Sequence, residues 1–389
     1  MSRKIVELGE ISNVTKLAGY EFTKHITYNN DGEIIALRAL NLSVGQLDLT
    51  NIKRIGRSVS EELPRSKLHK GDVLLSYTGT VGNYAIIEKD DVFHLAPNVC
   101  RIRASEKCIP EYLYYVVASP YFQNELISYN HGSTQATVPM KNIRKIKVPL
   151  PDIVEQQRIV KILKPIDDKI KLNRKMNETL EQIGQALFKK FFIDNPEVDS
   201  WKTGNLTDIT FVNKSTLGKD FAAEYINYID ISAVGIGSLE SCQHIKLSDA
   251  PSRAKRLVIA GDILWSTVRP NRRAFVRLGS LKANTVASTG FVVLSPKNNC
   301  SGYVYYHTTN QSFTDYLMRR AKGAAYPAVL ASDFSNAPIS IPPDLVLTEF
   351  DSIVKPILES KDHLMIESEK LFEIRDLLLP RLMSGQIEI

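Results

Sequence analysis

The stretch IVKILKPIDDKI, residues Ile159–Ile170, occurs again in altered form as FDSIVKPILESK, residues Phe350–Lys361. Pro165 and Pro356 occupy the same place in the two stretches, at an offset of 356 − 165 = 191 residues. Hydrophobic residues recur every three or four positions on both sides of each proline, as they do on one face of an α-helix. The two stretches therefore predict two related helices, one in each half of the chain.

The similarity extends well beyond these helices. Working outward, four further pairs match at an offset within one residue of 191: Tyr112–Tyr115 with Tyr303–Tyr306, Gly71–Leu74 with Gly261–Leu264, Glu178–Leu180 with Glu369–Leu371, and Leu187–Phe188 with Leu378–Leu379. Self-similarity at a fixed spacing is the mark of an internal repeat, and drift of a residue is what insertions in surface loops produce. The chain is therefore predicted to be a tandem duplication with a repeat of about 190 residues.

Each repeat ends in a long helix with a hydrophobic seam. The first is predicted to run from about Ile153 to Phe192. The seams suggest that the helices pair as an antiparallel coiled coil, through Ile159, Leu163, Ile166, Ile170, Leu180, Ile183 and Leu187 in the first helix and Ile357, Leu364, Leu371, Ile374 and Leu378 in the second. A buried polar residue on such a seam tends to fix its register, and Asn173 lies in that position. The alternative is that each helix only covers its own domain.

The segments before the helices have a different pattern. Short apolar runs such as Glu33–Leu37 and Asp262–Ser266 are separated by Gly, Pro and Asn, which is typical of strands and turns. Ile109–Ser119 and Ser301–Arg320 have helical patterns. We therefore expect an α+β fold with a pseudo-two-fold internal repeat. The predicted parts are a first domain at 1–150, a central helix at 151–200, a second domain at 201–342, and a distal helix with the C-terminal tail at 343–389.

Composition narrows the class of protein. The 389 residues include 43% hydrophobic and 24% charged residues, and the net charge is +6. A basic balance slightly favours a polyanionic partner such as nucleic acid. Four cysteines without a C-x-x-C pair exclude a disulfide scaffold and suit a reducing compartment. No apolar run approaches the length of about 18 residues that a membrane helix needs, so we expect a cytoplasmic protein without a membrane partner.

A domain–helix–domain–helix order has a functional implication of its own. If the two helices pair antiparallel, the two domains lie at opposite ends of a rod. Duplex DNA can be recognised through two short elements at a fixed spacing. Two non-identical domains would then recognise two different half-sites, with the helices setting the distance between them.

Several motifs resemble those of a known family. They are Gly71–Ile87 (GDVLLSYTGTVGNYAII), Gly132–Gln135 (GSTQ), Val148–Leu163 (VPLPDIVEQQRIVKIL), Leu172–Asp194 (LNRKMNETLEQIGQALFKKFFID), Ser266–Arg273 (STVRPNRR), Val286–Phe291 (VASTGF) and Leu377–Ile389 (LLLPRLMSGQIEI). Together they resemble the specificity (S) subunit of type I restriction–modification systems, over essentially the whole chain and in the family's order of target-recognition domain, helix, second target-recognition domain and helix.

The resemblance implies a non-catalytic chain that binds no cofactor itself. It implies a bipartite, asymmetric double-stranded DNA target and two docked methyltransferase (M) subunits, which transfer a methyl group from S-adenosylmethionine to adenine N6. Through these M subunits it implies restriction (R) subunits that use ATP with Mg²⁺ to translocate and cut DNA. The two helices would then form both the spacer and the docking surface for the M subunits.

Three groups of residues are candidate DNA contacts. The first is the glycine-containing loop Tyr77, Thr78, Gly79, Thr80, Gly82 and Asn83; the second is Arg269, Asn271, Arg272 and Arg273; the third is Ser133, Thr134, Gln135, Lys141, Arg144 and Lys145. Glycine allows close approach of the backbone to a phosphate, while arginine and asparagine can contact G and A. An ordinary hairpin turn and a solvated basic face are the alternative interpretations.

Two other functions remain to be weighed. A self-contained methyltransferase or nuclease is disfavoured, because the sequence has no Asn/Asp-Pro-Pro-aromatic stretch of an amino-methyltransferase and no metal-ligand spacing of histidines. The missing G-x-x-x-x-G-K-[ST] phosphate loop disfavours an ATP motor. Asp152 and Asp344 each follow a proline at the start of a predicted helix, where aspartate is typically a helix cap. A coiled-coil adaptor that binds only protein is the second rival.

Overall fold

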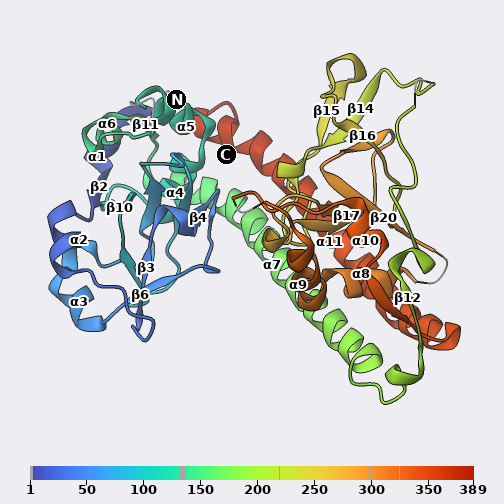
Figure 1. Cartoon of the computed structure of the whole chain (residues 1–389). Helices are drawn as coiled ribbons and strands as arrows, with labels where there is room; N and C mark the ends of the chain where they lie inside the picture. Colours follow the sequence, from blue (N-terminus) through green and yellow to red (C-terminus); the bar gives the residue numbers. More distant parts are fainter. Residues whose placement is uncertain (1–2, 131–135, 219, 298–299, 324) are drawn as a thin grey trace. The chain divides into compact units, whose positions relative to one another are not determined.

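The computed structural model describes residues 3–130, 136–218, 220–297, 300–323 and 325–389 (Figure 1). The chain divides into two compact units. Unit 1 comprises Met1–Ile170 and Lys370–Ile389, and unit 2 comprises Lys171–Glu369. Each unit thus contains one sheet domain and a part of both long helices.

The two long helices are α7, Ile153–Phe192, and α11, Asp344–Ser384. The predicted bounds of the first helix are confirmed. Asp152 caps α7, because its Oδ1 accepts a hydrogen bond from the backbone N–H of Glu155 at 2.8 Å. The structure therefore gives this aspartate a helix-capping contact.

Unit 1 has a mixed α and β architecture. A pair of antiparallel strands, β1 (Lys4–Glu7) and β11 (Lys147–Leu150), brings the start of the domain to its end. The central antiparallel sheet has the order β2 (Ser12–Lys16), β10 (Val99–Ala104), β7 (Val73–Ser76) and β8 (Tyr84–Ile86). Beside it lie the sheet β6 (Lys53–Ile55), β3 (Ile34–Leu37) and β9 (Phe93–Leu95), the hairpin β4 (Leu42–Ser43) and β5 (Gln46–Leu47), and the helices α1 (Leu8–Ile11), α2 (Gly19–His25), α3 (Arg57–Glu62), α4 (Pro110–Ala118), α5 (Pro120–Ser128) and α6 (Met140–Lys145).

Unit 2 repeats this plan. Strands β12 (Lys202–Asn205) and β21 (Pro338–Ile341) pair, and the central sheet has the order β13 (Thr210–Val212), β20 (Phe291–Pro296), β17 (Ile263–Ser266) and β18 (Phe275–Arg277). The second sheet has the order β15 (Gln243–Lys246), β14 (Tyr225–Ile229), β19 (Thr285–Ser288) and β16 (Ala254–Leu257), and the helices are α8 (Ser301–Thr309), α9 (Gln311–Arg320) and α10 (Ala331–Ser335). The α+β class and the internal repeat are therefore confirmed.

Helices α4 and α8 fill the space between sheet and long helices. Their side chains are almost all buried, including Tyr112 and Tyr115 in unit 1 and Tyr303 and Tyr306 in unit 2. The hydrophobic core of each unit is continuous from the central sheet through these tyrosines to the long helices. The tyrosine clusters therefore serve packing.

Within unit 2, α7 and α11 pair in opposite directions. Asn173 is fully buried and donates from Nδ2 to Glu367 Oε2 at 2.8 Å, while Glu181 further along α7 pairs with Lys361 earlier in α11. Residues that advance along one helix thus meet residues that recede along the other. Asn173 supplies a polar contact on the seam at the point where the sequence predicts one.

The predicted seam residues differ in burial. Ile159, Leu163 and Ile170 are buried in unit 1, whereas Ile183 in unit 2 and Ile374 in unit 1 are 45% and 47% exposed. The remaining predicted seam positions are all half-buried: Ile166, Leu180, Leu187, Ile357, Leu364, Leu371 and Leu378. The helix pair of each unit thus leaves part of its apolar surface open to solvent.

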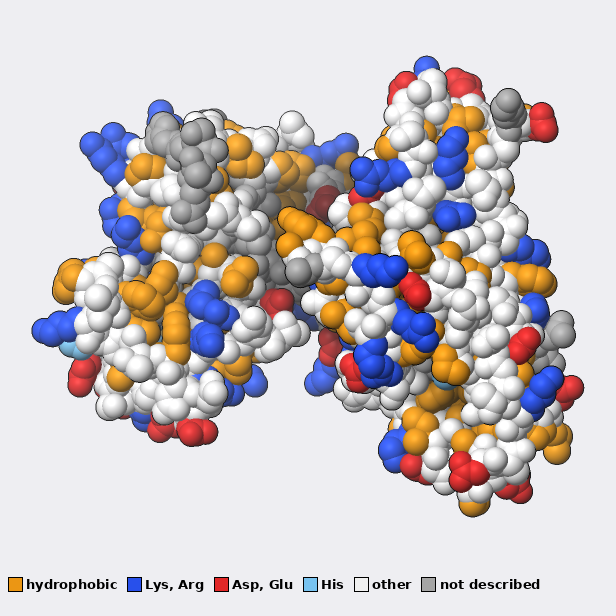
Figure 2. Space-filling model, viewed as in Figure 1, with side chains coloured by type: hydrophobic (Ala, Val, Ile, Leu, Met, Phe, Trp, Pro, Cys, Tyr) orange, Lys and Arg blue, Asp and Glu red, His pale blue; other side chains and the backbone are white. Residues whose placement is uncertain are grey.

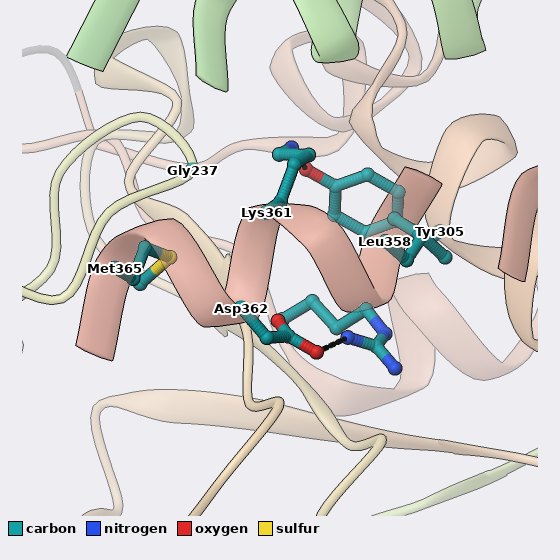
Figure 3. A pocket seen from close by; sticks show the side chains of 7 residues that line it. Gly237, Tyr305, Leu358, Lys361, Asp362 and Met365 are labelled. Atoms are coloured by element: carbon teal, nitrogen blue, oxygen red, sulfur yellow. Dashed lines mark hydrogen bonds and ion pairs between the residues drawn. The ribbon is translucent and has the colours of Figure 1, made fainter. Parts of the chain in front are cut away.

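A polar cluster fastens the helices of unit 2 to the sheet domain (Figure 3). The Tyr305 hydroxyl donates to Glu181 Oε2 at 2.9 Å, and the Lys361 ammonium contacts both groups. Burial and the Glu181 charge raise the pKa of Tyr305 well above its usual value, so its phenol stays protonated and can donate. Next to it, Arg277 pairs with Asp362 at 2.6 Å, and both residues line a cavity of about 10 Å³.

A different cluster performs this task in unit 1. The Tyr115 hydroxyl donates to Asp167 Oδ2 at 2.9 Å, and Arg375 from α11 approaches Asp167 Oδ1 at 3.3 Å. The side chains of Asp167 and Arg375 are 12% and 14% exposed. Burial and the Asp167 charge raise the pKa of Tyr115. One carboxylate therefore joins the sheet domain to both helices.

We expect that Arg375→Leu destabilises unit 1. Removing one partner of a buried ion pair leaves the other charge uncompensated, at a cost of about 3–5 kcal/mol. In denaturant unfolding of the whole chain, the lower free energy of unfolding should shift the transition to a lower denaturant concentration. The double variant Asp167→Leu with Arg375→Leu removes both charges and should recover part of the lost stability, although the Tyr115 hydroxyl then loses its acceptor. Equal destabilisation of the single and double variants would contradict this role of the charge pair.

Candidate DNA interface

The glycine-containing loop of unit 1 is a tight connection between β7 and β8. Gly79 and Gly82 have φ values of +81° and +99°, which side chains other than glycine adopt at a cost. The Ser76 hydroxyl closes the loop by donating to the Thr80 carbonyl. A Cβ on Gly82 would lie 2.7 Å from Gln123 Oε1, so the glutamine side chain would have to shift to admit it. The loop is thereby held in one conformation.

The segment 136–138 lies beside this loop. The Gly79 N–H donates to the Ala136 carbonyl at 2.9 Å, and the Val138 N–H donates to the Tyr77 carbonyl at 2.9 Å. The Lys16 ammonium lies 5.2 Å from the centre of the Tyr77 ring. Burial raises the pKa of Tyr77, so its hydroxyl remains a neutral hydrogen-bonding group.

Unit 2 builds the equivalent place with the same backbone bonds. The Arg269 N–H donates to the Pro327 carbonyl at 2.7 Å and the Val329 N–H donates to the Thr267 carbonyl at 2.9 Å. These bonds match those of Gly79 and Val138, at offsets of 269 − 79 = 190 and 329 − 138 = 191 residues. The two units thus share the backbone frame of the candidate interface but not its side chains.

The unit 2 loop contains arginines where unit 1 has glycines. Arg269 and Arg273 flank the short 3₁₀ helix Pro270–Arg272, and both have a left-handed φ of +53°. The Arg269 guanidinium lies 4.2 Å from the centre of the Tyr326 ring. Asn271 and Arg272 are exposed. A set of cationic and amide groups therefore points outward from a rigid loop.

More basic residues surround this loop. The 3₁₀ helix packs against α9, whose last turn carries Arg319 and Arg320, and Lys322 follows directly. All three are exposed. Figure 2 shows Lys and Arg side chains gathered on the face of unit 2 near α9. Such a surface attracts a polyanion.

Some predicted contact residues are already engaged within their own unit. Asn83 Nδ2 donates to the Leu42 carbonyl, Arg144 Nη2 donates to the Val14 carbonyl, and Arg273 Nη2 donates to the Thr309 carbonyl, each at 2.7 Å. Thr80 in the loop and Lys141 and Lys145 on α6 are exposed, as is Arg144 itself. The predicted residues Ser133, Thr134 and Gln135 lie outside the described residues.

Tyr326 and Lys16 lie at the candidate interface but were not predicted from the sequence as DNA contacts. Tyr326 is 69% exposed, and it lies opposite the arginine loop because 327–329 pairs with 267–269. The internal repeat could have pointed to Tyr326, because Gly323–Tyr326 lies 191 residues after the candidate segment Gly132–Gln135 (323 − 132 = 191). Lys16 had no local signal, since only the sheet brings the end of β2 beside Tyr77.

Two further searches concern other kinds of site. Among the described residues, no group of three or more His, Cys, Asp or Glu side chains could hold a metal ion. Within the same ranges, no helix is long and apolar enough to cross a membrane.

Comparison with known proteins decides the family. The family model described as "Type I restriction modification DNA specificity domain" matches residues 3–182 and 198–348. The chain belongs to this family. The sequence is 24% identical to the MjaIX specificity subunit of Methanocaldococcus jannaschii, over 100% of this chain and 93% of the relative. It is also 24% identical to the HindI specificity subunit of Haemophilus influenzae, over 99% of both.

A solved structure shows the same fold. The S subunit of a type I restriction–modification system from M. genitalium superposes with a TM-score of 0.57 and 14% identity, covering 98% of this chain and 96% of that one. As a member of the family, the chain is a DNA specificity subunit of a type I restriction–modification system, a non-catalytic component of the complex. This specificity subunit thus carries two copies of one backbone frame with different exposed side chains.

The contacts of Arg144 predict a structural effect at the rim of the candidate interface. We expect Arg144→Met to remove its hydrogen bond to Val14 and to lower stability by about 1 kcal/mol. For a unit of this size, that corresponds to a melting temperature roughly 2–4 °C lower.

Lys141→Met and Lys145→Met are matched controls on the same helix. Both side chains are exposed, so thermal melting should leave the midpoint of either variant unchanged. Equal midpoints for all three variants would show that the Arg144 contact contributes nothing to stability.

Proposed function

We propose that each unit of this specificity subunit contacts one half of a bipartite, asymmetric double-stranded DNA target. One observation carries the proposal: the equivalent loops share their backbone bonds, yet one has Gly79 and Gly82 where the other has Arg269, Arg272 and Arg273. Equal frames with different side chains would recognise different half-sites, because base edges are distinguished by donors and acceptors.

Within this proposal the two loops have different chemistry. In unit 1, Tyr77, Thr78, Thr80 and the glycine backbone offer neutral donors and acceptors beside the cation Lys16. In unit 2, Arg269 and Arg272 offer charged donors, and Asn271 offers an amide. Arginine contacts guanine through O6 and N7, and asparagine contacts adenine through N6 and N7. Exposed lysines and arginines nearby, such as Lys141, Lys145, Arg319 and Arg320, would contact phosphates.

The helices would have two tasks. The pairing of α7 with α11 would set the spacing between the half-sites. Their exposed apolar residues would dock two methyltransferase subunits, which use S-adenosylmethionine, and through them restriction subunits that use ATP with Mg²⁺. The two relatives are specificity subunits of type I restriction enzymes, which supports partners of this kind. The specificity subunit itself would hold no cofactor.

The test is to express this chain with its methyltransferase subunit and to map methylated adenines across the host genome. We expect one bipartite, asymmetric motif that disappears when the specificity subunit is omitted. Replacing residues 1–150 with the matching segment of another specificity subunit should change only one half of that motif. A replacement that altered both halves, or neither, would refute the division into half-sites.

Docking of the methyltransferase subunit can be tested on α7. Leu172 and Met176 form an exposed apolar patch of unit 2, 51% and 43% accessible, with Ile183 seven residues further on the same face. The double variant Leu172→Gln with Met176→Gln should weaken binding of the methyltransferase subunit at least about tenfold, since buried apolar anchors dominate interfaces.

The matched control for docking is Ile259→Gln. Ile259 is 61% exposed in unit 2 but lies outside the helix pair, so its replacement should leave the affinity unchanged. Calorimetric titration of the purified chain with the methyltransferase subunit measures both effects. If the double variant still binds the methyltransferase subunit tightly, the docking surface does not include Leu172 and Met176.

A further inference from the structure

An unusual backbone conformation in unit 2 occurs at Arg269, a half-buried cation. Arg269 has a φ of +53°, a left-handed conformation that is unfavourable for a side chain with a Cβ. The equivalent residue of unit 1 is Gly79, at φ +81°, where no such cost arises. The backbone frame therefore requires this conformation, and unit 2 tolerates an arginine in it.

Strain of this kind persists where the side chain has a use. The neighbouring Arg273, also at φ +53°, has a visible one, because its Nη2 donates to the Thr309 carbonyl at 2.7 Å within the fold. Among the described residues, the contact recorded for the Arg269 side chain is the Tyr326 ring, at 4.2 Å. That contact holds the guanidinium but satisfies none of its five donors.

Backbone hydrogen bonds close the two ends of the loop that carries Tyr326. Lys322 and Ala328 exchange two backbone hydrogen bonds of 2.9 Å, and Gly323 turns the chain with a φ of +97°. A Cβ on Gly323 would lie 2.9 Å from the Tyr326 carbonyl oxygen, so the turn leaves no space there. The Tyr326 side chain is 69% exposed, and its ring lies against the Arg269 guanidinium and constrains the plane of that group.

The surroundings favour a nucleic acid as the ligand of this pair. Arg272, Arg319, Arg320 and Lys322 are exposed around it. The nearby carboxylates are engaged, since Asp315 accepts from the Gln311 amide and Asp333 accepts from the Leu330 N–H. A planar, held guanidinium matches the O6 and N7 acceptors of guanine in the major groove.

We propose that Tyr326 and Arg269 form the base-recognition pair of unit 2: Arg269 contacts a guanine in its half-site, and Tyr326 is the positioning residue that fixes the guanidinium plane. This rests on the proposed function and deepens it. It assigns a role to Tyr326, and it assigns Arg269 to a base and not to a phosphate.

The experiment uses the full chain with its methyltransferase subunit and the methylation map of the host genome. We expect Arg269→Gly and Tyr326→Leu to relax the motif at one G·C position in the unit 2 half. Discrimination there should fall roughly five- to 150-fold, the range for a lost bidentate base contact. Tyr326→Phe keeps the ring and should restore the wild-type motif.

Thermal melting separates recognition from folding. Glycine relieves the strain at residue 269, so Arg269→Gly should melt no lower than the wild type. Asn284→Gly is the matched control: Asn284 is an exposed residue of unit 2 with a φ of +57°, and its replacement should leave the motif unchanged.

The outcomes distinguish this proposal from the function on which it rests. An unchanged motif in Arg269→Gly or in Tyr326→Leu overturns the pair while the bipartite motif stands. A uniform drop in methylation at every site, without relaxation at one position, assigns Arg269 to a phosphate and also overturns it. If the wild-type chain with its methyltransferase subunit produces no methylation motif, both the proposed function and the base-recognition pair are refuted.

Discussion

The structure depends on buried polar contacts between the tyrosine-bearing helices and the long helix pair, and the two units make these contacts differently. In unit 1 the contact joins Tyr115, Asp167 and Arg375. At an offset of 191 residues, unit 2 has Tyr306, Leu358 and Gly184 in their places. There the hydroxyl of Tyr306 lies against Gly184, where an added Cβ would come within 1.9 Å of it.

Unit 2 instead uses Tyr305, Glu181 and Lys361, whose unit 1 equivalents are Tyr114, Phe372 and Ile170. A duplicated fold has thus acquired two different attachments.

This difference has a physical consequence. A buried carboxylate is tolerated only beside its own partners, because desolvation of an unpaired charge costs more than any single hydrogen bond returns. A unit 1 domain placed on the unit 2 helix segments would set Tyr115 against Gly184 and would lack Arg375. The polar clusters therefore distinguish the two sheet domains from each other, although the hydrophobic seams alone would accept either. Apolar packing supplies stability, and the polar clusters add specificity to the pairing.

Much of this fold could be predicted from the sequence, and the limits have physical causes. The spacing of hydrophobic residues every three or four positions predicted α7 from Ile153 to Phe192, because the extent of a helix is largely a local property of the sequence. Asn173 stood out for the same reason. The partner of Asp167 could not be predicted, since Arg375 lies 208 residues away. At the candidate interface, composition singled out the arginines but could not tell Arg269 from Arg273. That distinction arises from the Thr309 carbonyl and the Tyr326 ring, which tertiary structure alone brings near them.

The backbone frame of the interface explains how one fold can serve different targets. The hydrogen bonds between 77–79 and 136–138 in unit 1, and between 267–269 and 327–329 in unit 2, involve only main-chain atoms. Such bonds are indifferent to most side chains, so residues at 79 and 269 can differ without moving the loop. The frame sets one restriction, a left-handed residue at this position, which glycine meets freely and arginine meets at a cost. A loop that keeps arginine there gives up some stability. If these loops contact DNA as proposed, a change of target needs only new side chains on a constant backbone frame, and Arg269 marks a place where function would outweigh stability.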